Sequence, residues 1–239
     1  MKKARGRPPK CPVDSLRTRI WFKAILVTSG FTSAYKVEMC LDGERVKKRD
    51  KDVARPKKWD SYEKGTVAPS DKPGKRNSVE LAEAAFNGTA KWFRSPLWAI
   101  LQGEKWSRNE YEKVLKALGD DVRNILFEKS RLDPNDLWIK AVDDAVLFQV
   151  YSLGTFESFV AIVLLIQYSE VISSEKLRKD ALFFYPHSQK FLRKIPELEL
   201  FCDEIFHHCD LVCKHWTFLS PSQRMDVVIF SKSRDETTN

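Results

Sequence analysis

A chain of 239 residues and 27.7 kDa, with 43% hydrophobic and 31% charged residues, is large enough for one large or two small domains and apolar enough to fold. Its longest uninterrupted apolar run, Phe159 to Ile166, falls far short of the roughly 20 residues that span a bilayer, so we expect no membrane partner. No apolar segment follows the basic N-terminus, as a secretory signal would require, and five scattered cysteines do not form a disulfide framework. We therefore expect a cytoplasmic protein.

Positive charge is concentrated in the first half of the chain. Residues 1–105 contain 24 Lys and Arg against 12 Asp and Glu, a net charge of +12, whereas residues 106–239 contain 17 against 21, a net charge of −4. A high local density of Lys and Arg favours nucleic-acid binding, because neutralising phosphates releases condensed counterions. The alternative is a basic surface that has no polyanionic partner. The asymmetry favours a nucleic-acid-binding region joined to a domain with another task.

Helix signals dominate the first hundred residues. Asp14 is a candidate N-cap for a helix with apolar residues at helical spacing, and Gly30 ends it. Thr32 and Ser78 are candidate N-caps of two later helices, and Gly65 follows a short helix between them. The expected helices of this half are 14–29, 32–42, 56–64, 78–86, 89–94 and 97–101.

Beyond Gly103 the pattern predicts a longer series of helices. Ser107 and Glu110 have capping-box spacing, and Thr155 opens a helix that is apolar nearly all round, which we expect at the centre of a second core. The expected helices are 107–118, 133–152, 155–172, 174–184, 187–194, 196–216 and 221–230. The prediction is an all-α fold, in which a small basic bundle precedes a larger C-terminal helical domain. The predicted organisation is a basic arm (1–14), a DNA-binding domain (15–103), an oligomerisation or partner-binding domain (104–230) and a flexible tail (231–239).

The N-terminal arm contains the string Arg5-Gly6-Arg7-Pro8, followed by Pro9 and Lys10. It resembles the core of an AT-hook, which lies extended in a narrow A·T minor groove. Glycine lets the backbone approach the groove floor, and arginines sit in the strong negative potential there. The alternative is a basic tail that contacts phosphates without sequence preference.

A second motif is the string Tyr62-Glu63-Lys64-Gly65-Thr66-Val67-Ala68-Pro69-Ser70. It resembles the end of the recognition helix and the following turn in the lambda-repressor-like (Xre-type) helix-turn-helix family, and the resemblance covers roughly residues 15–101. It implies that Trp59 and Tyr62 pack inward and that Gly65 is a left-handed cap. The residues that it places toward the major groove are Lys57, Lys58, Asp60 and Ser61.

The spacing of the helices departs from that family. About 14 residues, rather than a few, separate the second and third expected helices, and this insertion is itself a candidate DNA-contacting arm. Its basic residues are Lys47, Lys48, Arg49, Lys51 and Arg55. The alternative is a basic bundle that binds another protein and carries the motif by chance.

Metal, cofactor and enzyme signatures are weak. Cys202, Cys209 and Cys213 fall along one stripe of an expected helix, but Cys202 would lie about 10 Å from Cys209 at 1.5 Å per residue. We interpret these cysteines as buried hydrophobic residues rather than metal ligands, although Cys209 and Cys213 are close enough to share an ion. No phosphate-binding glycine loop, nucleophile elbow or zinc-protease helix occurs. We predict no cofactor, no metal and no catalytic residues.

These patterns together predict a sequence-specific double-stranded DNA-binding protein of bacterial or phage-like style, acting as a transcriptional regulator. The C-terminal domain would form a homodimer or bind a protein partner. The alternatives are a DNA-targeting or adaptor subunit of a mobile-element or defence complex, and a protein-interaction module whose basic half binds RNA or an acidic partner. The candidate DNA-contacting residues are Arg5, Arg7, Lys10, Lys47, Lys48, Arg49, Lys51, Arg55, Lys57, Lys58, Ser61 and Lys64.

Overall fold

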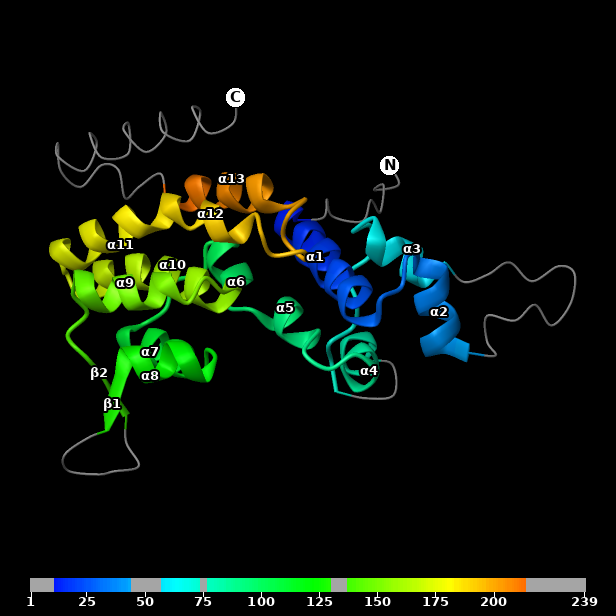
Figure 1. Ribbon diagram of the computed structural model, residues 1–239, viewed down its shortest axis with the longest axis horizontal. Helices are drawn as coiled ribbons and strands as arrows, with labels where there is room; N and C mark the ends of the chain where they lie inside the picture. Colours follow the sequence, from blue (N-terminus) through cyan, green and yellow to red (C-terminus); the bar gives the residue numbers. More distant parts are fainter. Residues whose placement is uncertain (1–10, 44–56, 74–76, 130–136, 214–239) are drawn as a thin grey trace, which may run out of the picture. The chain divides into compact units, whose positions relative to one another are not determined.

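The computed structural model describes residues 11–43, 57–73, 77–129 and 137–213, apart from the side chain of Cys213 (Figure 1). The fold is mainly α-helical, as predicted, and the described residues contain one small two-stranded sheet. The chain divides into two compact units, residues 1–98 and 99–239. The expected helix 221–230 and the tail 231–239 lie outside the described residues.

The first unit is organised around its longest helix, α1. The helices of this unit are α1 (Pro12–Ser29), α2 (Ala34–Asp42), α3 (Lys58–Glu63), α4 (Ser78–Ala85), α5 (Ala90–Arg94) and α6 (Leu97–Leu101), the last of which continues into the second unit. Leu16, Ile20 and Trp21 of α1 are fully buried, and α1 packs against both α3 and α5. Gly30 ends α1 in the left-handed conformation, at φ 69°, as predicted.

The predicted caps of the first two helices are wrong, by three residues for α1, whose N-cap is Cys11, and by one residue for α2. Helix α1 begins at Pro12, so Asp14 lies in its first turn instead of capping it, because proline is already suited to the first helical position. The N-cap of α2 is Ser33 and not Thr32, since the Ser33 side chain accepts a hydrogen bond from the amide of Lys36.

The start of α4 is also shifted by one residue from the prediction. Asn77 is the N-cap, and its side chain accepts a hydrogen bond from the amide of Glu80 at 3.0 Å. Ser78 is buried, and its hydroxyl lies 3.1 Å from the hydroxyl of Tyr62 in α3. Ser78 therefore links α4 to α3 instead of capping a helix.

Helix α5 is capped from outside by Glu83 of α4. The Glu83 carboxylate accepts hydrogen bonds from the amides of Gly88 and Ala90, at 2.8 and 2.6 Å, and from the Thr89 hydroxyl at 3.3 Å. Burial opposes the ionisation of Glu83, but the hydrogen bonds from Ala90, Gly88 and Thr89 outweigh it and hold the pKa of the carboxyl below its ordinary value. This carboxylate satisfies amides that the short helix α5 cannot satisfy itself.

Glu83→Gln should lower the free energy of unfolding by about 1 kcal/mol at pH 7. Since the folded state holds the pKa of Glu83 below its unfolded value of about 4.3, the carboxylate stabilises the fold above that pH, and its contribution is lost as the pH falls through the folded pKa. Urea denaturation of both proteins at pH 7 and pH 3 measures this. The exposed Glu63→Gln is the control, and an equal destabilisation by Glu83→Gln at both pH values would contradict the capping role.

The second unit is organised around α10. Its elements are α7 (Arg108–Lys116), α8 (Asp120–Leu126), β1 (Phe127–Lys129), β2 (Leu137–Ile139), α9 (Asp144–Ser152), α10 (Phe156–Val171), α11 (Glu175–His187), α12 (Gln189–Leu192) and α13 (Cys202–Cys213). Helix α10 is buried almost all round and packs against α7, α9 and α11, which confirms the predicted central helix. The capping box predicted at Ser107 is present, and Thr155, which was predicted only to open α10, forms a capping box as well.

The single helix expected over 133–152 is wrong. Strand β2 pairs with β1 as an antiparallel ladder in which Ile139 lies opposite Phe127, and α9 begins only after Asp143. The Asp143 side chain accepts a hydrogen bond from the amide of Val146 at 2.9 Å and so sets the later helix start. The aromatic and β-branched residues of β2 favour a strand once β1 provides a partner.

The boundary between the units lies within α6, between Trp98 and Ala99, whereas the sequence placed it after Gly103. The Trp98 indole nitrogen donates a buried hydrogen bond to the carbonyl oxygen of Trp92 at 2.8 Å, which holds Trp98 to the first unit. A helix that continues across a boundary leaves no glycine or proline signal there, so the sequence marks the nearest loop instead.

Candidate nucleic-acid interface

The inner face of α3 is part of the aromatic core of the first unit. Trp59 and Tyr62 are buried, which confirms the orientation that the sequence predicted. The Trp21 ring of α1 lies 6.0 Å from that of Trp59, in a stacked arrangement, and 5.6 Å from that of Tyr62. Phe93 of α5 packs against Trp21 at 5.7 Å. These contacts fix the rotation of α3 about its axis, so that its opposite face is directed away from the core.

Asp42, the last residue of α2, anchors the start of α3. Its carboxylate accepts a 2.6 Å hydrogen bond from the indole nitrogen of Trp59 and a 3.2 Å hydrogen bond from the ammonium of Lys58. The same ammonium lies 4.9 Å from the centre of the Trp59 ring. Lys58 is therefore held against the fold by Asp42, although the sequence assigned its side chain to the major groove.

The outer face of α3 carries the remaining candidates. Lys57 and Lys64 are exposed at its two ends, and Asp60 and Ser61 are half-buried between them. The Ser61 hydroxyl donates a 3.1 Å hydrogen bond to the carbonyl oxygen of Lys57. Lys57 has a φ of 54°, a left-handed conformation that is uncommon outside glycine. The helix thus presents a short polar surface with a lysine at each end.

Gly65 ends α3 in a turn that lies directly on α1. Its φ of 62° confirms the left-handed conformation predicted from the motif, and its amide donates to the carbonyl oxygen of Tyr62 at 2.9 Å. A Cβ on Gly65 would lie 2.8 Å from the carbonyl oxygen of Ser15 and closer still to the hydroxyl oxygen of that residue. Glycine is thus required here both by backbone conformation and by the close approach to α1.

Most of the basic candidates lie outside the described residues: Arg5, Arg7, Lys10, Lys47, Lys48, Arg49, Lys51 and Arg55. Residues 1–10, 44–56 and 74–76 contain 13 Lys and Arg against three Asp and Glu, which accounts for +10 of the net charge of +12 in residues 1–105. The described part of the first unit is therefore close to neutral.

The folded body fixes where the basic segment 44–56 leaves and returns. Residue 43 follows α2 directly and Lys57 precedes α3, and the contacts of Asp42 with Lys58 and Trp59 bring these two helix ends together. Both ends of the segment are thus attached beside the start of α3. The sequence contains no signal for this placement, because it depends on a contact between two helices.

Two arginines of the first unit are engaged within the fold. Arg17 of α1 donates from Nε to the carbonyl oxygen of Phe93 at 2.5 Å, and its guanidinium lies 3.7 Å from the centre of the Phe93 ring. Arg94 donates to the carboxylates of Asp71 and Glu80, which ties the loop before α4 to α5. Burial lowers the pKa of Arg17, and the hydrogen bonds with Asp71 and Glu80 raise the pKa of Arg94. Both side chains stabilise the fold.

The cysteines of α13 are placed as the hydrophobic interpretation expects. Cys202 and Cys209 are both buried, whereas the side chain of Cys213 lies outside the described residues. Among the side chains that the structure describes, no group of three or more His, Cys, Asp or Glu is arranged to hold a metal ion.

Comparisons with protein-family models, with curated proteins and with solved structures find no match to this chain. The resemblance to the lambda-repressor-like family therefore stays a prediction. None of the described helices is long and apolar enough to cross a membrane.

Proposed function

We propose that this chain is a sequence-specific double-stranded DNA-binding protein and that its first unit contacts the duplex. The observation that carries the proposal is the charge distribution. Residues 1–98 contain 23 Lys and Arg against 11 Asp and Glu, and residues 99–239 contain 18 against 22. The net charges of the two units are thus +12 and −4. A polyanion is attracted to the first unit alone.

The geometry of α3 supports a role in base contacts, because both ends of the basic segment 44–56 are attached beside the start of this helix. Trp59 and Tyr62 on the inner face of α3 pack in the core, and the outer face of the helix presents Lys57, Ser61 and Lys64. With six residues, α3 is about 9 Å long at 1.5 Å per residue, which limits base contacts to two or three side chains. Most of the affinity would then come from phosphate contacts by residues 1–10 and 44–56.

The contacts of Lys58 change its expected role. An ammonium that is paired with Asp42 and packed on Trp59 must break both contacts to reach a base. We propose that Lys57 and Lys64 are the lysines of α3 that contact DNA, and that Lys58 holds α3 to α2.

The second unit would form a homodimer or bind a protein partner. The chain would act as a transcriptional regulator or as the DNA-targeting subunit of a mobile-element or defence complex.

Two groups of substitutions in the full chain should reduce DNA binding in different ways. Lys57→Ala should cost about 1 to 3 kcal/mol on a preferred site selected from genomic fragments and little on random DNA. The triple change of Lys47, Lys48 and Arg49 to Ala should weaken both DNAs alike and lower the slope of log affinity against log salt by about one per charge. Mobility shifts between about 50 and 200 mM salt measure both effects.

The exposed Lys190→Ala in the second unit is the matched control and should leave both DNAs unaffected. Binding of single-stranded RNA in preference to duplex DNA, or equal losses from Lys190→Ala and the triple change, would contradict the proposal. Sedimentation of the full chain tests the proposed dimer.

A further inference from the structure

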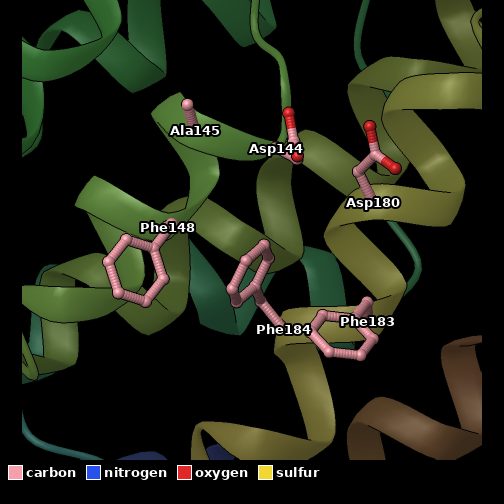
Figure 2. A pocket seen from close by; sticks show the side chains of 6 residues that line it. All are labelled: Asp144, Ala145, Phe148, Asp180, Phe183 and Phe184. Atoms are coloured by element: carbon pink, nitrogen blue, oxygen red, sulfur yellow. The ribbon is translucent and has the colours of Figure 1, made fainter.

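An open pocket of about 440 Å³ lies between α9 and α11 of the second unit (Figure 2). Its lining combines three aromatic rings with two carboxylates. The lining residues are Asp144, Ala145, Phe148, Asp180, Phe183 and Phe184. No role in DNA binding requires such a pocket on the acidic unit, so its composition points to a second ligand.

The aromatic side of the pocket exposes two phenylalanines on neighbouring helices. Phe148 of α9 is 57% exposed and Phe183 of α11 is 52% exposed, whereas Phe184 between them is buried. The Phe184 ring lies 6.4 Å from that of Phe148 and 5.3 Å from that of Phe183, so it packs between them. Paired exposed rings on a rigid base form a surface for a flat or apolar group.

The acidic side is formed by Asp144 and Asp180, whose carboxyl groups lie above the three rings in the view of Figure 2. Asp144 is exposed in the first turn of α9. Asp180 is only 20% exposed, and its buried Oδ2 accepts no hydrogen bond from any residue that the structure describes. The Lys176 ammonium approaches this oxygen to 3.8 Å, but its own side chain is 73% exposed. Asp180 is therefore a partly desolvated carboxylate whose ion pair is long and easily exchanged.

We propose that this pocket binds the guanidinium of an arginine side chain from a partner protein. An anion is excluded by the two carboxylates, and a purely apolar segment would bury them without compensation. A guanidinium can interact with both the aromatic and the acidic side of the pocket, since its planar face stacks on aromatic rings while its N–H groups donate to carboxylates. An ammonium is more strongly hydrated and stacks less well, so arginine is favoured over lysine. The net charge of −4 on residues 99–239 attracts a basic partner to this unit.

No Lys, Arg or His of the described residues lines the pocket. Lys176 and Lys179 are exposed on α11, and the His187 ring packs on Phe183 at 4.9 Å while its Nδ1 lies 2.8 Å from the Phe183 carbonyl oxygen. Displacing Lys176 from Asp180 releases a long surface ion pair, which costs little.

The test titrates the full chain with three five-residue peptides that differ only at the central position, which is arginine, citrulline or norleucine. Citrulline keeps the shape of arginine without its charge, and norleucine keeps only an apolar stem. Chemical shifts of isotope-labelled phenylalanine rings report binding. We expect the arginine peptide to perturb Phe148 and Phe183, with an affinity on the order of 5- to 30-fold above that of the other two.

Asp180→Asn and Phe183→Ala should each weaken the arginine peptide by a similar factor. Asp121→Asn and Leu200→Ala change an exposed carboxylate and an exposed apolar side chain elsewhere on this unit, and they should leave binding within about twofold. Equal binding of arginine and norleucine peptides would overturn the proposal and identify a plain apolar contact surface. A monomer produced from an oligomer by Phe183→Ala would also overturn it, because the pocket would then be an interface between copies of this chain.

Discussion

Trp59→Ala is expected to destabilise the first unit by about 3 to 5 kcal/mol, enough to unfold a unit of ordinary stability. The Trp59 ring is fully buried and packs against Trp21 and Tyr62, at 6.0 and 5.4 Å. Its indole nitrogen also donates to Asp42, so the substitution removes the bond that joins α2 to α3 as well as the core packing. Both losses fall on the contacts that orient the outer face of α3.

Urea denaturation followed by near-ultraviolet circular dichroism separates this effect from a general loss of aromatic signal. Trp138→Ala is the matched control, since Trp138 is 58% exposed and lies in the second unit. The control should change stability by less than about 0.5 kcal/mol. If the Trp59→Ala variant were as stable as the control, the contacts of Trp59 would not hold α3 in place. The orientation of the outer face of α3 would then have no explanation in these contacts.

Gly65→Ala is expected to cost about 2 to 4 kcal/mol. Alanine in the left-handed region is strained by about 1 to 2 kcal/mol, and the new methyl group would collide with the backbone of Ser15, which cannot move without shifting α1. Because the turn at Gly65 fixes the position of α3 against α1, we expect the affinity for DNA to fall together with the free energy of unfolding.

Gly30→Ala provides the control for the conformational part of this cost. Gly30 has a similar φ of 69°, but a Cβ there would meet nothing within 4 Å. The free energy of unfolding of the Gly65 variant should therefore fall further than that of the Gly30 variant, and the difference measures the close approach to Ser15. Equal losses of stability in the two variants would show that the turn and α1 can move apart at little cost in free energy.

The parts of the fold that the sequence predicted well depend on short-range physics. Gly30 and Gly65 stop helices because only glycine enters the left-handed region without strain, and Ser107 and Thr155 satisfy the amides of the first turn that follows each of them. Errors of one residue at Thr32 and Ser78 arose because neighbouring Ser, Thr and Asn side chains are equally able to cap.

Long-range contacts explain what the sequence did not predict. The strand β2 was read as helix because its residues become a strand only when β1 lies beside them. Lys58 was assigned to DNA because nothing near it in the sequence indicates that its ammonium pairs with the carboxylate of Asp42, 16 residues earlier. The pocket between α9 and α11 has no sequence signature either, since Asp144 and Asp180 come together only through the packing of two helices.

The sequence by itself determined that this chain is mainly helical, that its positive charge lies in the first half and that Trp59 and Tyr62 form the inner side of a short helix. The first two follow from composition and from apolar residues at helical spacing, which a residue and its near neighbours settle, whereas the inward placement of Trp59 and Tyr62 is what the resemblance to the lambda-repressor-like family implied. Only the tertiary structure decided which lysines of α3 are free to meet a ligand, where the basic segment 44–56 is attached and which acidic residues share a pocket with exposed phenylalanines. These three features depend on which helices pack against each other, and that packing joins residues that are far apart in the sequence.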